Sequence, residues 1–330
     1  MLNLHELNIF TTAAEQSSFS KAGRILHLSQ PAISQTIQNL ERRLKTELFV
    51  RYGRTIRLTA AGETLLPLAR ELLANANRLE ETMASLHGAV IGRIQIGCST
   101  TSGKYILPGL IARFRNRFPQ VRIDVQVTSR DGVLRRLADN KINFGVSSKQ
   151  IEHHDLISWP IFTDEVILIT CPNHPWSRFR RVYVDDLLDT EIVMRDQISG
   201  TYSVLMRELA VRNISEDMLN VAMVLGNAES IVSAVEEGIG IAFVSRLAAA
   251  HSLALGRVIE VEVEGMSLKR DLYFIRSQRF PASRAAGEFW DYLQNDLSAK
   301  TYMEYLSKGK GGYRANGTSS ALIEEIEKEL

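Results

Sequence analysis

The sequence predicts an α/β protein with an all-α head that ends in a β-wing. Two observations predict the head. Two helical patterns with a two-residue break lie within residues 18–44, and two short strand-like runs follow them. A third observation predicts the body, because strands and helices alternate from Arg93 onwards, which implies a mainly parallel sheet with helices on both faces. With 330 residues, 45% of them apolar and 23% charged, the chain is long enough for two or three domains.

A helix-turn-helix follows a first helix that we expect at about residues 4–16. Its first helix covers about residues 19–26, and Ser29 is a good N-cap for the second, with Pro31 in the first turn. One face of the second helix is apolar, with Ile33, Ile37, Leu40 and Leu44 at helical spacing. The opposite face carries Gln30, Ser34, Gln35 and Gln38. Short hydrogen-bonding side chains of this kind suit base edges in a major groove.

A solvated helical hairpin is the plain alternative, and the residues after the pair weigh against it. The two strand-like runs, 49–51 and 55–58, flank Gly53 and carry Arg51, Arg54 and Arg57. An arginine on such a wing suits phosphates or a narrow minor groove. Residues 1–60 hold eight Lys and Arg against four Asp and Glu, so their net charge is +4. The net charge of the whole chain is +1, so the other 270 residues carry −3. A basic head on a slightly acidic body is typical of DNA-binding proteins.

The head also matches a known pattern over about its first 62 residues. The matching segments are Ser18-Phe19-Ser20, Leu26, Ser29-Gln30-Pro31-Ala32-Ile33-Ser34, Leu40-Glu41, Leu48-Phe49-Val50-Arg51 and Leu58-Thr59-Ala60-Ala61-Gly62. They resemble the N-terminal signature of LysR-type transcriptional regulators. The resemblance implies a winged helix-turn-helix domain over residues 1–59 that binds promoter double-stranded DNA. Its expected contact residues are Gln30, Pro31, Ser34, Gln35, Gln38, Arg51 and Arg54.

The recognition helix departs from the family, whose members often carry basic residues after the Gln-Pro-Ala segment. Here Gln35, Thr36, Gln38 and Asn39 are all neutral. Glutamine pairs with adenine N6 and N7, whereas arginine pairs with guanine O6 and N7. We therefore expect a preference for A·T pairs where Gln35 reads.

A long helix, capped by Thr59 and running to about residue 87, predicts a coiled-coil linker over residues 60–88. Leu65, Leu72, Leu79 and Leu86 recur every seven residues, and Gly62, Ala69, Ala76 and Met83 precede each of them by three. This heptad pattern favours a dimer seam made by Leu65, Leu72, Leu79, Met83 and Leu86, although packing on the chain's own head is the alternative. Residues 88–92, which include two glycines, predict a hinge.

The body reads as an effector-binding domain over residues 93–297. This region resembles the LysR effector-binding domain, which is similar to type 2 periplasmic binding proteins. The resemblance rests on the order of the elements, a polar loop at 99–103, Asn173-His174-Pro175 and Gly238-Ile239-Gly240-Ile241-Ala242. The resemblance implies subdomain one at 93–163 and 268–297 and subdomain two at 164–267, closing around a small ligand. The surroundings of residues 99–108 look most like regulators of sulfur or carbon assimilation.

The expected effector site gathers hydroxyl groups at strand ends, where α/β folds bind ligands. Its residues are Ser99, Thr100, Thr101, Ser102, Thr128, Ser147 and Thr201. Hydroxyls and free amide groups at a helix start favour an anionic small-molecule effector. The alternative is that these residues merely cap helices; Thr100 and Thr201 match family contact positions.

Catalysis, metals and cofactors find little support. The sequence lacks a nucleophile elbow and a P-loop, and Gly238-Ile239-Gly240 lacks the third glycine of a dinucleotide site. His153, His154 and Asp155 could bind a metal, but adjacent histidines point apart on a strand, and exposed loop residues are the better interpretation, so we expect no metal. Cys98 and Cys171 read as buried free thiols.

The expected partners are promoter DNA, the effector, a second copy of the chain and RNA polymerase, without a membrane. By resemblance the protein is a homodimer that pairs into a homotetramer. The N-terminus lacks a signal peptide, which predicts a cytoplasmic protein. A solute sensor whose head only dimerises is the competing class, and an enzyme is the third. Residues 298–330 read as a flexible tail beyond the usual end of the family, with an acidic helix at 321–330 as the alternative.

Overall fold

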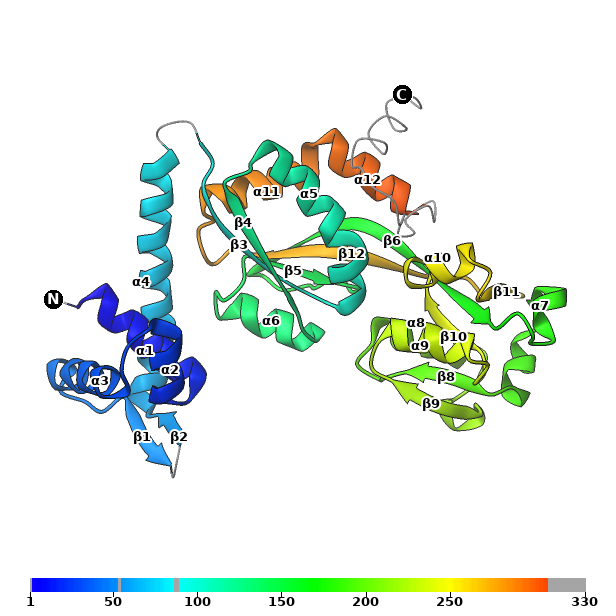
Figure 1. The fold of residues 1–330 in the computed structure, drawn as a ribbon, viewed down its shortest axis with the longest axis horizontal. Coiled ribbons are helices and arrows are strands. Elements are labelled where there is room, and N and C mark those ends of the chain that lie inside the picture. The colour runs from blue at the N-terminus through cyan, green and yellow to red at the C-terminus, as the bar shows by residue number, and fades with distance from the viewer. Residues whose placement is uncertain (1, 53–54, 86–88, 308–330) are drawn as a thin grey trace. The chain divides into compact units, whose positions relative to one another are not determined.

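The computed structural model describes residues 2–52, 55–85 and 89–307. It divides into two compact units, Met1–Gly92 and Arg93–Leu330, and each is described here by itself (Figure 1). Arg54 at the wing, Leu86 of the heptads, Gly88 of the hinge and the tail from residue 308 lie outside the described residues.

The head contains three short helices, a two-stranded wing and one long helix, as expected. Their bounds are α1 Leu4–Gln16, α2 Phe19–Leu26, α3 Gln30–Leu44, β1 Phe49–Tyr52, β2 Thr55–Leu58 and α4 Ala60–Ser85. The two predicted caps are confirmed. The Ser29 hydroxyl accepts a hydrogen bond from the Ala32 amide at 3.3 Å, and the Thr59 hydroxyl accepts one from the Gly62 amide at 3.0 Å. Local capping chemistry therefore defines the helix starts.

The turn between α2 and α3 depends on Gly23. A Cβ at this position would lie 2.6 Å from the carbonyl oxygen of Leu28, so only glycine allows this close approach. Below the turn, Leu7, Phe10, Ile33, Ile37 and Leu40 form a core that is at most 2% exposed. The predicted apolar stripe of α3 is thus the face that packs inward.

The long helix α4 changes character along its length. Ala69 is fully buried against the head core, and Leu65 packs there too. A Cβ at Gly62 would lie 2.3 Å from the carbonyl oxygen of Leu48, so Gly62 also serves the head's own packing. Leu72, Leu79 and Met83 are 45%, 65% and 57% exposed. The first part of the heptad pattern thus follows the alternative interpretation, packing on the chain's own head.

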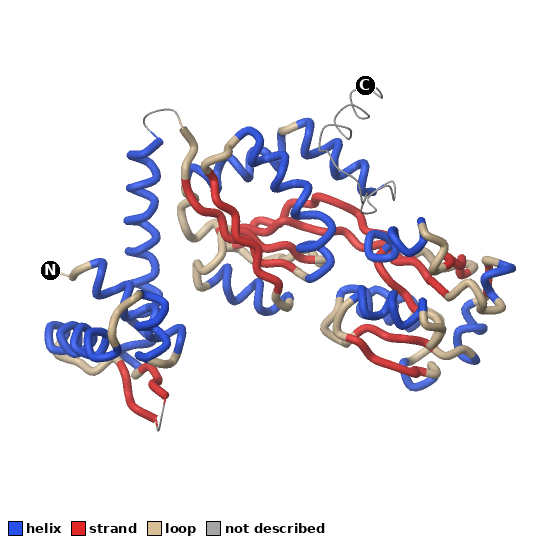
Figure 2. The backbone as a smooth tube through the Cα atoms, in the orientation of Figure 1, coloured by secondary structure: helices blue, strands red, loops and turns tan. Residues whose placement is uncertain are grey.

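The second unit is built on an eight-stranded mixed sheet and a separate pair of strands (Figure 2). The order in the large sheet is β4-β3-β5-β12-β6-β11-β7, and β10 also pairs with β6, while β8 pairs with β9. The strands are β3 Gly92–Cys98, β4 Val121–Val127, β5 Phe144–Ser147, β6 Leu156–Thr170, β7 Arg181–Val182, β8 Ile192–Arg195, β9 Val221–Leu225, β10 Ala242–Ser245, β11 Ile259–Val263 and β12 Leu268–Ser277.

The helices of this unit surround those strands, with α6 and α11 on opposite sides of the subdomain-one strands in Figure 1. They are η1 Ser102–Ile106, α5 Leu107–Arg117, α6 Arg130–Ala138, α7 Trp176–Phe179, η2 Val184–Asp189, α8 Gly200–Ala210, η3 Glu216–Met218, α9 Ala228–Glu236, α10 Arg246–Ala254, α11 Arg284–Asn295 and α12 Leu297–Ser307.

The two long strands β6 and β12 connect the subdomains. They pair antiparallel from Leu268 opposite Val166 to Ser277 opposite Leu156, with one irregularity beside Leu272. The sheet is therefore mixed, and the expectation of a mainly parallel sheet is wrong. The parallel pairs include β3 with β5, β7 with β11 and β8 with β9, whereas the antiparallel pairs of β5, β10 and β11 are made with the crossing strands.

Several segments differ from the expected elements. The polar loop expected at 99–103 is helical from Thr100, and residues 102–106 form a π-turn. The expected start of the flexible tail is instead helix α12, whose Ala299, Tyr302, Met303 and Leu306 are at most 8% exposed. Helix α10 lies where no element was expected. Residues 298–307 are therefore a packed part of the second unit.

Each subdomain has its own apolar core. In subdomain one, the rings of Phe114 and Phe289 meet edge to face at 4.9 Å, and Phe144 stacks on Trp290. In subdomain two, two clusters of buried aliphatic side chains cover the faces of β8 and β10, with Ile192 and Val193 on opposite sides. The strand ends between these cores are the positions where the predicted effector residues lie.

Candidate functional sites

The outer face of α3 presents the predicted base-contacting side chains to solvent. Gln30, Pro31, Gln35 and Gln38 are exposed, and Ser34 is half-buried. They lie opposite the buried stripe, which fixes their direction. The structure thus places all five on one accessible helix surface.

A hydrogen-bond chain orders the middle of this surface. The Gln35 side-chain amide donates to the Asn39 side-chain oxygen at 3.1 Å, and Arg42 donates to the same oxygen. The second N–H of Gln35 and its carbonyl oxygen stay available, which is the donor and acceptor pair that adenine requires. Asn39 and Arg42 were not among the predicted contacts, although their helical spacing from Gln35 was readable from the sequence.

The wing is braced by Glu41. One carboxylate oxygen of Glu41 accepts hydrogen bonds from the amides of Leu48 and Phe49 at 2.8 and 3.2 Å, which fixes the start of β1. Val50 and Arg57 are register partners in the hairpin, and Arg51 is exposed. Arg43 is held by a two-pronged pair with Glu6 at 2.7 Å, so it stabilises the head. The wing therefore presents Arg51 at an exposed position on a hairpin strand whose start is fixed by Glu41.

The first stretch of the predicted effector site is only partly accessible. Ser99 is exposed and Thr100 is half-buried, whereas Thr101 and Ser102 are 6% and 1% exposed. The hydroxyls of Ser99 and Ser102 lie 3.2 Å apart. Thr128 is half-buried, and its amide donates to the Cys98 carbonyl at 2.9 Å, so its strand end lies next to this helix start.

The other predicted effector residues meet across the two subdomains. A Cβ at Gly200 would lie 2.4 Å from the hydroxyl of Ser148, which brings the end of β5 against the start of α8. The neighbouring Ser147 is buried and exchanges hydrogen bonds with the backbone of Lys149, so its hydroxyl is used in a local turn. Thr201 is 3% exposed. Ser147 and Thr201 therefore lie next to this contact between the subdomains, and their side chains are largely committed to other groups.

Two arginines near these residues were not among the predicted effector residues. Arg270 on β12 donates to the Thr201 hydroxyl at 3.1 Å and to Asp164 at 2.6 and 2.8 Å. Asp164 is fully buried and also accepts from the Ser245 hydroxyl at 2.7 Å. Each of the three nitrogens of the Arg270 guanidinium thus has a hydrogen-bond partner, and Arg270 is a structural cation.

The second arginine, Arg195, is less well satisfied. One of its terminal nitrogens donates to the Gly226 carbonyl at 3.1 Å and lies 3.6 Å from Asp196. Its Nε is buried and has no hydrogen-bond partner among the described residues. Burial lowers the pKa of Arg195, Asp196 opposes this shift, and Arg270 adds to it. Arg195 is the last residue of β8, and this position at the carboxyl end of a strand could have marked it in the sequence.

A further contact joins the subdomains at the π-turn that follows Thr101. The ammonium group of Lys104 lies 3.3 Å from the carboxylate of Glu229 on α9. Burial, followed by the charge of Glu229, raises the pKa of Tyr105. Residues of the π-turn thus reach subdomain two directly.

His153 and His154 lie in a loop and not on a strand, so the rule that adjacent histidines point apart does not apply to them. The rings of His153 and His154 stack at 4.5 Å, and with Asp155 they place ligand atoms within 4.8 Å of one another. His153 Nδ1 already accepts the Asp155 amide, and both histidines are exposed, as the sequence predicted for a loop. Cys98 is buried as expected, whereas Cys171 is only half-buried.

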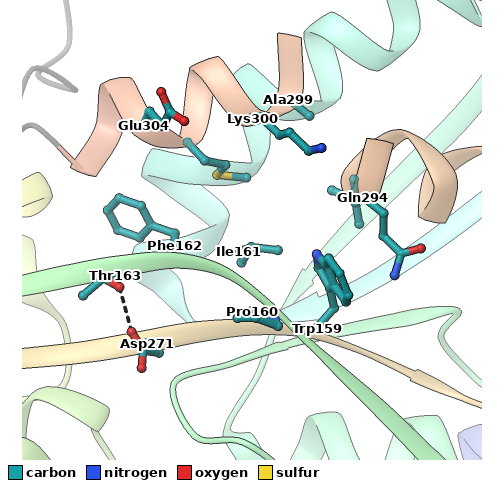
Figure 3. A pocket seen from close by; sticks show the side chains of 12 residues that line it. Trp159, Pro160, Ile161, Phe162, Thr163, Asp271, Gln294, Ala299, Lys300 and Glu304 are labelled. Carbon is teal, nitrogen blue, oxygen red and sulfur yellow. Dashed lines mark hydrogen bonds between the residues drawn. The ribbon is translucent and has the colours of Figure 1, made fainter. Parts of the chain in front are cut away.

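A pocket of about 410 Å³ lies away from these residues, between β6, β12, α11 and α12 (Figure 3). Trp159, Phe162 and Met303 line it, and the Thr163 hydroxyl donates to Asp271 at its rim. None of the predicted effector residues borders it. Among the described residues, no helix combines the length and the apolar character that crossing a membrane requires.

A winged helix-turn-helix head and a two-subdomain α/β body are the architecture of a ligand-responsive transcriptional regulator. Two family models match: "Bacterial regulatory helix-turn-helix protein, lysR family" over residues 4–63 and "LysR substrate binding domain" over residues 87–298. The chain belongs to the LysR family of transcriptional regulators, which bind promoter DNA and small-molecule effectors and form oligomers. The sequence-based family assignment and the interpretation as a regulator, not an enzyme, are confirmed.

The chain is similar to curated regulators along most of its length. A "Probable RuBisCO transcriptional regulator" from Cyanidioschyzon merolae is 36% identical over 295 residues, covering 88% of this chain and 97% of the relative. The "HTH-type transcriptional activator CmpR" from Synechocystis is 30% identical, covering 88% and 94%.

Solved structures show the same fold at lower identity. Full-length OxyR from Pseudomonas aeruginosa matches with a TM-score of 0.68 at 20% identity, covering 91% of this chain and 97% of that one. CbnR in complex with its target DNA matches with a TM-score of 0.61 at 20% identity, covering 89% and 99%.

Proposed function

We propose that this regulator controls carbon-assimilation genes, with RuBisCO genes among its targets. The support is that several relatives of 30% identity or more, which the chain covers almost fully, carry the name RuBisCO transcriptional regulator. The protein would act in the cytoplasm as a dimer or tetramer and would contact RNA polymerase at the promoter. Gln30, Pro31, Ser34, Gln35 and Gln38 would meet base edges, while Arg51 and Arg54 would hold the backbone or minor groove.

We further propose that the effector is a small anion bound between the subdomains. The residues around it would be Ser99, Thr100, Thr101, Ser102, Thr128, Ser147 and Thr201, joined by Arg195. One observation carries this proposal: the buried Nε of Arg195 has no hydrogen-bond partner among the described residues. A buried charged donor without a partner is costly, and a carboxylate, phosphate or bicarbonate oxygen would remove that cost.

The dimer would form along α4. Leu72, Leu79 and Met83 are exposed on the described part of this helix, and a facing helix with the same heptads would bury them. Leu65, by contrast, would stabilise mainly the head. Leu86 would extend the seam by one heptad.

Selection of bound genomic DNA fragments by the purified protein, at near-physiological salt, tests the promoter proposal. We expect enrichment of a short dyad upstream of RuBisCO and other carbon-assimilation genes, with half-sites about one helical turn or its multiples apart. Enrichment at unrelated promoters would contradict the choice of target genes. Retention without sequence preference would contradict specific binding.

Calorimetric titration tests the anion proposal with inorganic phosphate, bicarbonate and malonate, and with malonamide as a neutral mimic of malonate. We expect at least one anion to bind and malonamide not to bind. Arg195→Gln should abolish that binding, whereas Arg207→Gln, at an exposed position on α8, should preserve it. Equal binding of malonate and malonamide, or binding by no anion, would overturn the proposal.

A further inference from the structure

Helix α12 is packed against the effector-binding unit although the matched family domain ends at residue 298. Its inner face is formed by Ala299, Tyr302, Met303 and Leu306, all at most 8% exposed. Met303 and Ala299 line the pocket of Figure 3 from the α12 side, and residues 159–163 of β6 also line it. Tyr302 makes a different set of contacts, with α5 and the π-turn before it.

The phenol of Tyr302 reaches the backbone of the π-turn. Its oxygen lies 3.3 Å from the Ile106 carbonyl oxygen and 3.4 Å from that of Tyr105, so one proton is shared between the last two carbonyls of the turn. The ring lies 4.2 Å from the guanidinium of Arg113. A Cβ at Gly109 would lie 2.2 Å from the phenol oxygen, so glycine leaves the space that this contact needs.

The π-turn is a part of the helix that needs outside support. Leu107 donates its amide to Ser102 five residues earlier, which widens the turn, and such turns are rare. The next residue, Pro108, has no amide hydrogen, so the helix lacks a further backbone bond at this point. The shape of the turn therefore depends on tertiary contacts such as the one from Tyr302.

The same turn carries Ser102, which belongs to the proposed anion site, and Lys104, which contacts subdomain two. Ser102 lies with its hydroxyl 3.2 Å from that of Ser99, and Lys104 pairs with Glu229 across the subdomains at 3.3 Å. A shift of the turn would therefore move the cleft hydroxyls and the contact between subdomains together. Tyr302 touches none of these groups, and it acts only through the backbone of the turn.

We propose that Tyr302 is a positioning residue of the effector cleft, through which α12 holds the π-turn in its binding shape. This inference rests on the proposed function of the cleft as an anion site. Burial raises the pKa of the Tyr302 phenol to about 12, so the hydroxyl remains a donor throughout the physiological range. Helix α12 then contributes to effector binding through this hydrogen bond.

Tyr302→Phe tests the proposal because it removes only the hydroxyl and keeps the ring over Arg113. Tyr305→Phe on the same helix is the matched control, since Tyr305 has no hydrogen bond within the described residues. Both full-length variants should fold with nearly unchanged melting temperatures. We expect faster amide hydrogen exchange at residues 102–110 and several-fold weaker binding of the anion that the unsubstituted protein binds, in Tyr302→Phe alone.

Gly109→Ala is a second way to remove the hydrogen bond between Tyr302 and the π-turn, because its methyl group would displace the phenol. Its effects on exchange and on anion binding should resemble those of Tyr302→Phe, and the two should combine less than additively. Unchanged exchange and unchanged binding in Tyr302→Phe would overturn the role of Tyr302. If the unsubstituted protein bound neither phosphate, bicarbonate nor malonate, the anion site itself would be refuted, and with it the cleft part of this inference. The exchange data would still report on the contact with the turn.

Discussion

Asp164 and Arg270 form a two-pronged ion pair, at 2.6 and 2.8 Å, between register partners on the two strands that cross from one subdomain to the other. Both side chains are at most 7% exposed. Breaking such a pair leaves a buried charge without its counter-charge, which typically costs about 3–5 kcal/mol.

Asp164→Asn should therefore lower the free energy of unfolding of the second unit by about 3–5 kcal/mol in denaturant titrations. The matched control is Glu262→Gln, which breaks a pair with Arg181 whose side chains are about 60% exposed and should change stability by no more than about 1 kcal/mol. Equal effects of the two substitutions would contradict a structural role for the buried pair.

Gln35→Ala should relax the base preference at one position of the binding site. Loss of a side chain that pairs with adenine removes about 1–3 kcal/mol of discrimination at that base pair and leaves the others unchanged. Selected-site sequencing with both proteins provides the measurement, and Gln38→Ala should alter a different position. A guanine preference at the position affected by Gln35 would refute the A·T expectation.

Arg51→Ala should weaken binding to all DNA sequences to a similar extent. A lost phosphate contact also reduces the slope of log affinity against log salt by about 1. Fluorescence anisotropy at several salt concentrations measures both effects. Arg122→Ala, in the second unit, removes a highly exposed arginine of the same kind and should leave the slope unchanged. A change of sequence preference in Arg51→Ala would assign this residue to base reading instead.

Leu79→Glu, combined with Met83→Glu, should convert the protein to a folded monomer. Both side chains are more than half exposed in the single chain, so the charges would disrupt only a facing helix. Leu65→Glu should instead unfold the head, because Leu65 packs on its core. Sedimentation velocity with circular dichroism separates the two outcomes, and a dimer that persisted in the double variant would place the interface elsewhere.

Cys98 should resist thiol reagents in the native protein. Burial raises the pKa of its thiol to about 12, so almost no thiolate exists at pH 8, and the reactive thiolate would appear only as the pH approached that value. Cys171 is half-buried and should be labelled first. Timed labelling with a maleimide, followed by peptide mass analysis, checks the order; rapid native labelling of Cys98 would contradict its buried position.

The head could be predicted almost to the residue because its signals are local. Ser29 and Thr59 mark helix starts, and the stripe from Ile33 to Leu44 sets the buried face. By contrast, the first half of β6 contains Pro160 and no clean alternation, and it becomes a strand only by pairing with β12 about a hundred residues later. Long-range pairing of this kind leaves no trace in a short window of sequence.

The same reason explains the missed site residues. Asp164 and Arg270 are 106 positions apart in the sequence. Neither their ion pair nor its link to Thr201 could therefore be predicted from the sequence. Helix α12 was different, because Ala299, Tyr302, Met303 and Leu306 have helical spacing that could have been found. The tail was expected there because chains of the family usually end near residue 297.

The place of β12 between β5 and β6 also affects the order in which the nascent chain can fold. Residues 164–267 are contiguous, so subdomain two can acquire its core while the ribosome is still synthesising the rest. Subdomain one is missing an inner strand of its sheet until residue 277 has left the exit tunnel, some 180 residues after its first strand has emerged. A premature stop shortly before residue 268 would therefore release a protein with a finished DNA-binding head and an open sheet edge, which is a natural substrate for chaperones and proteases.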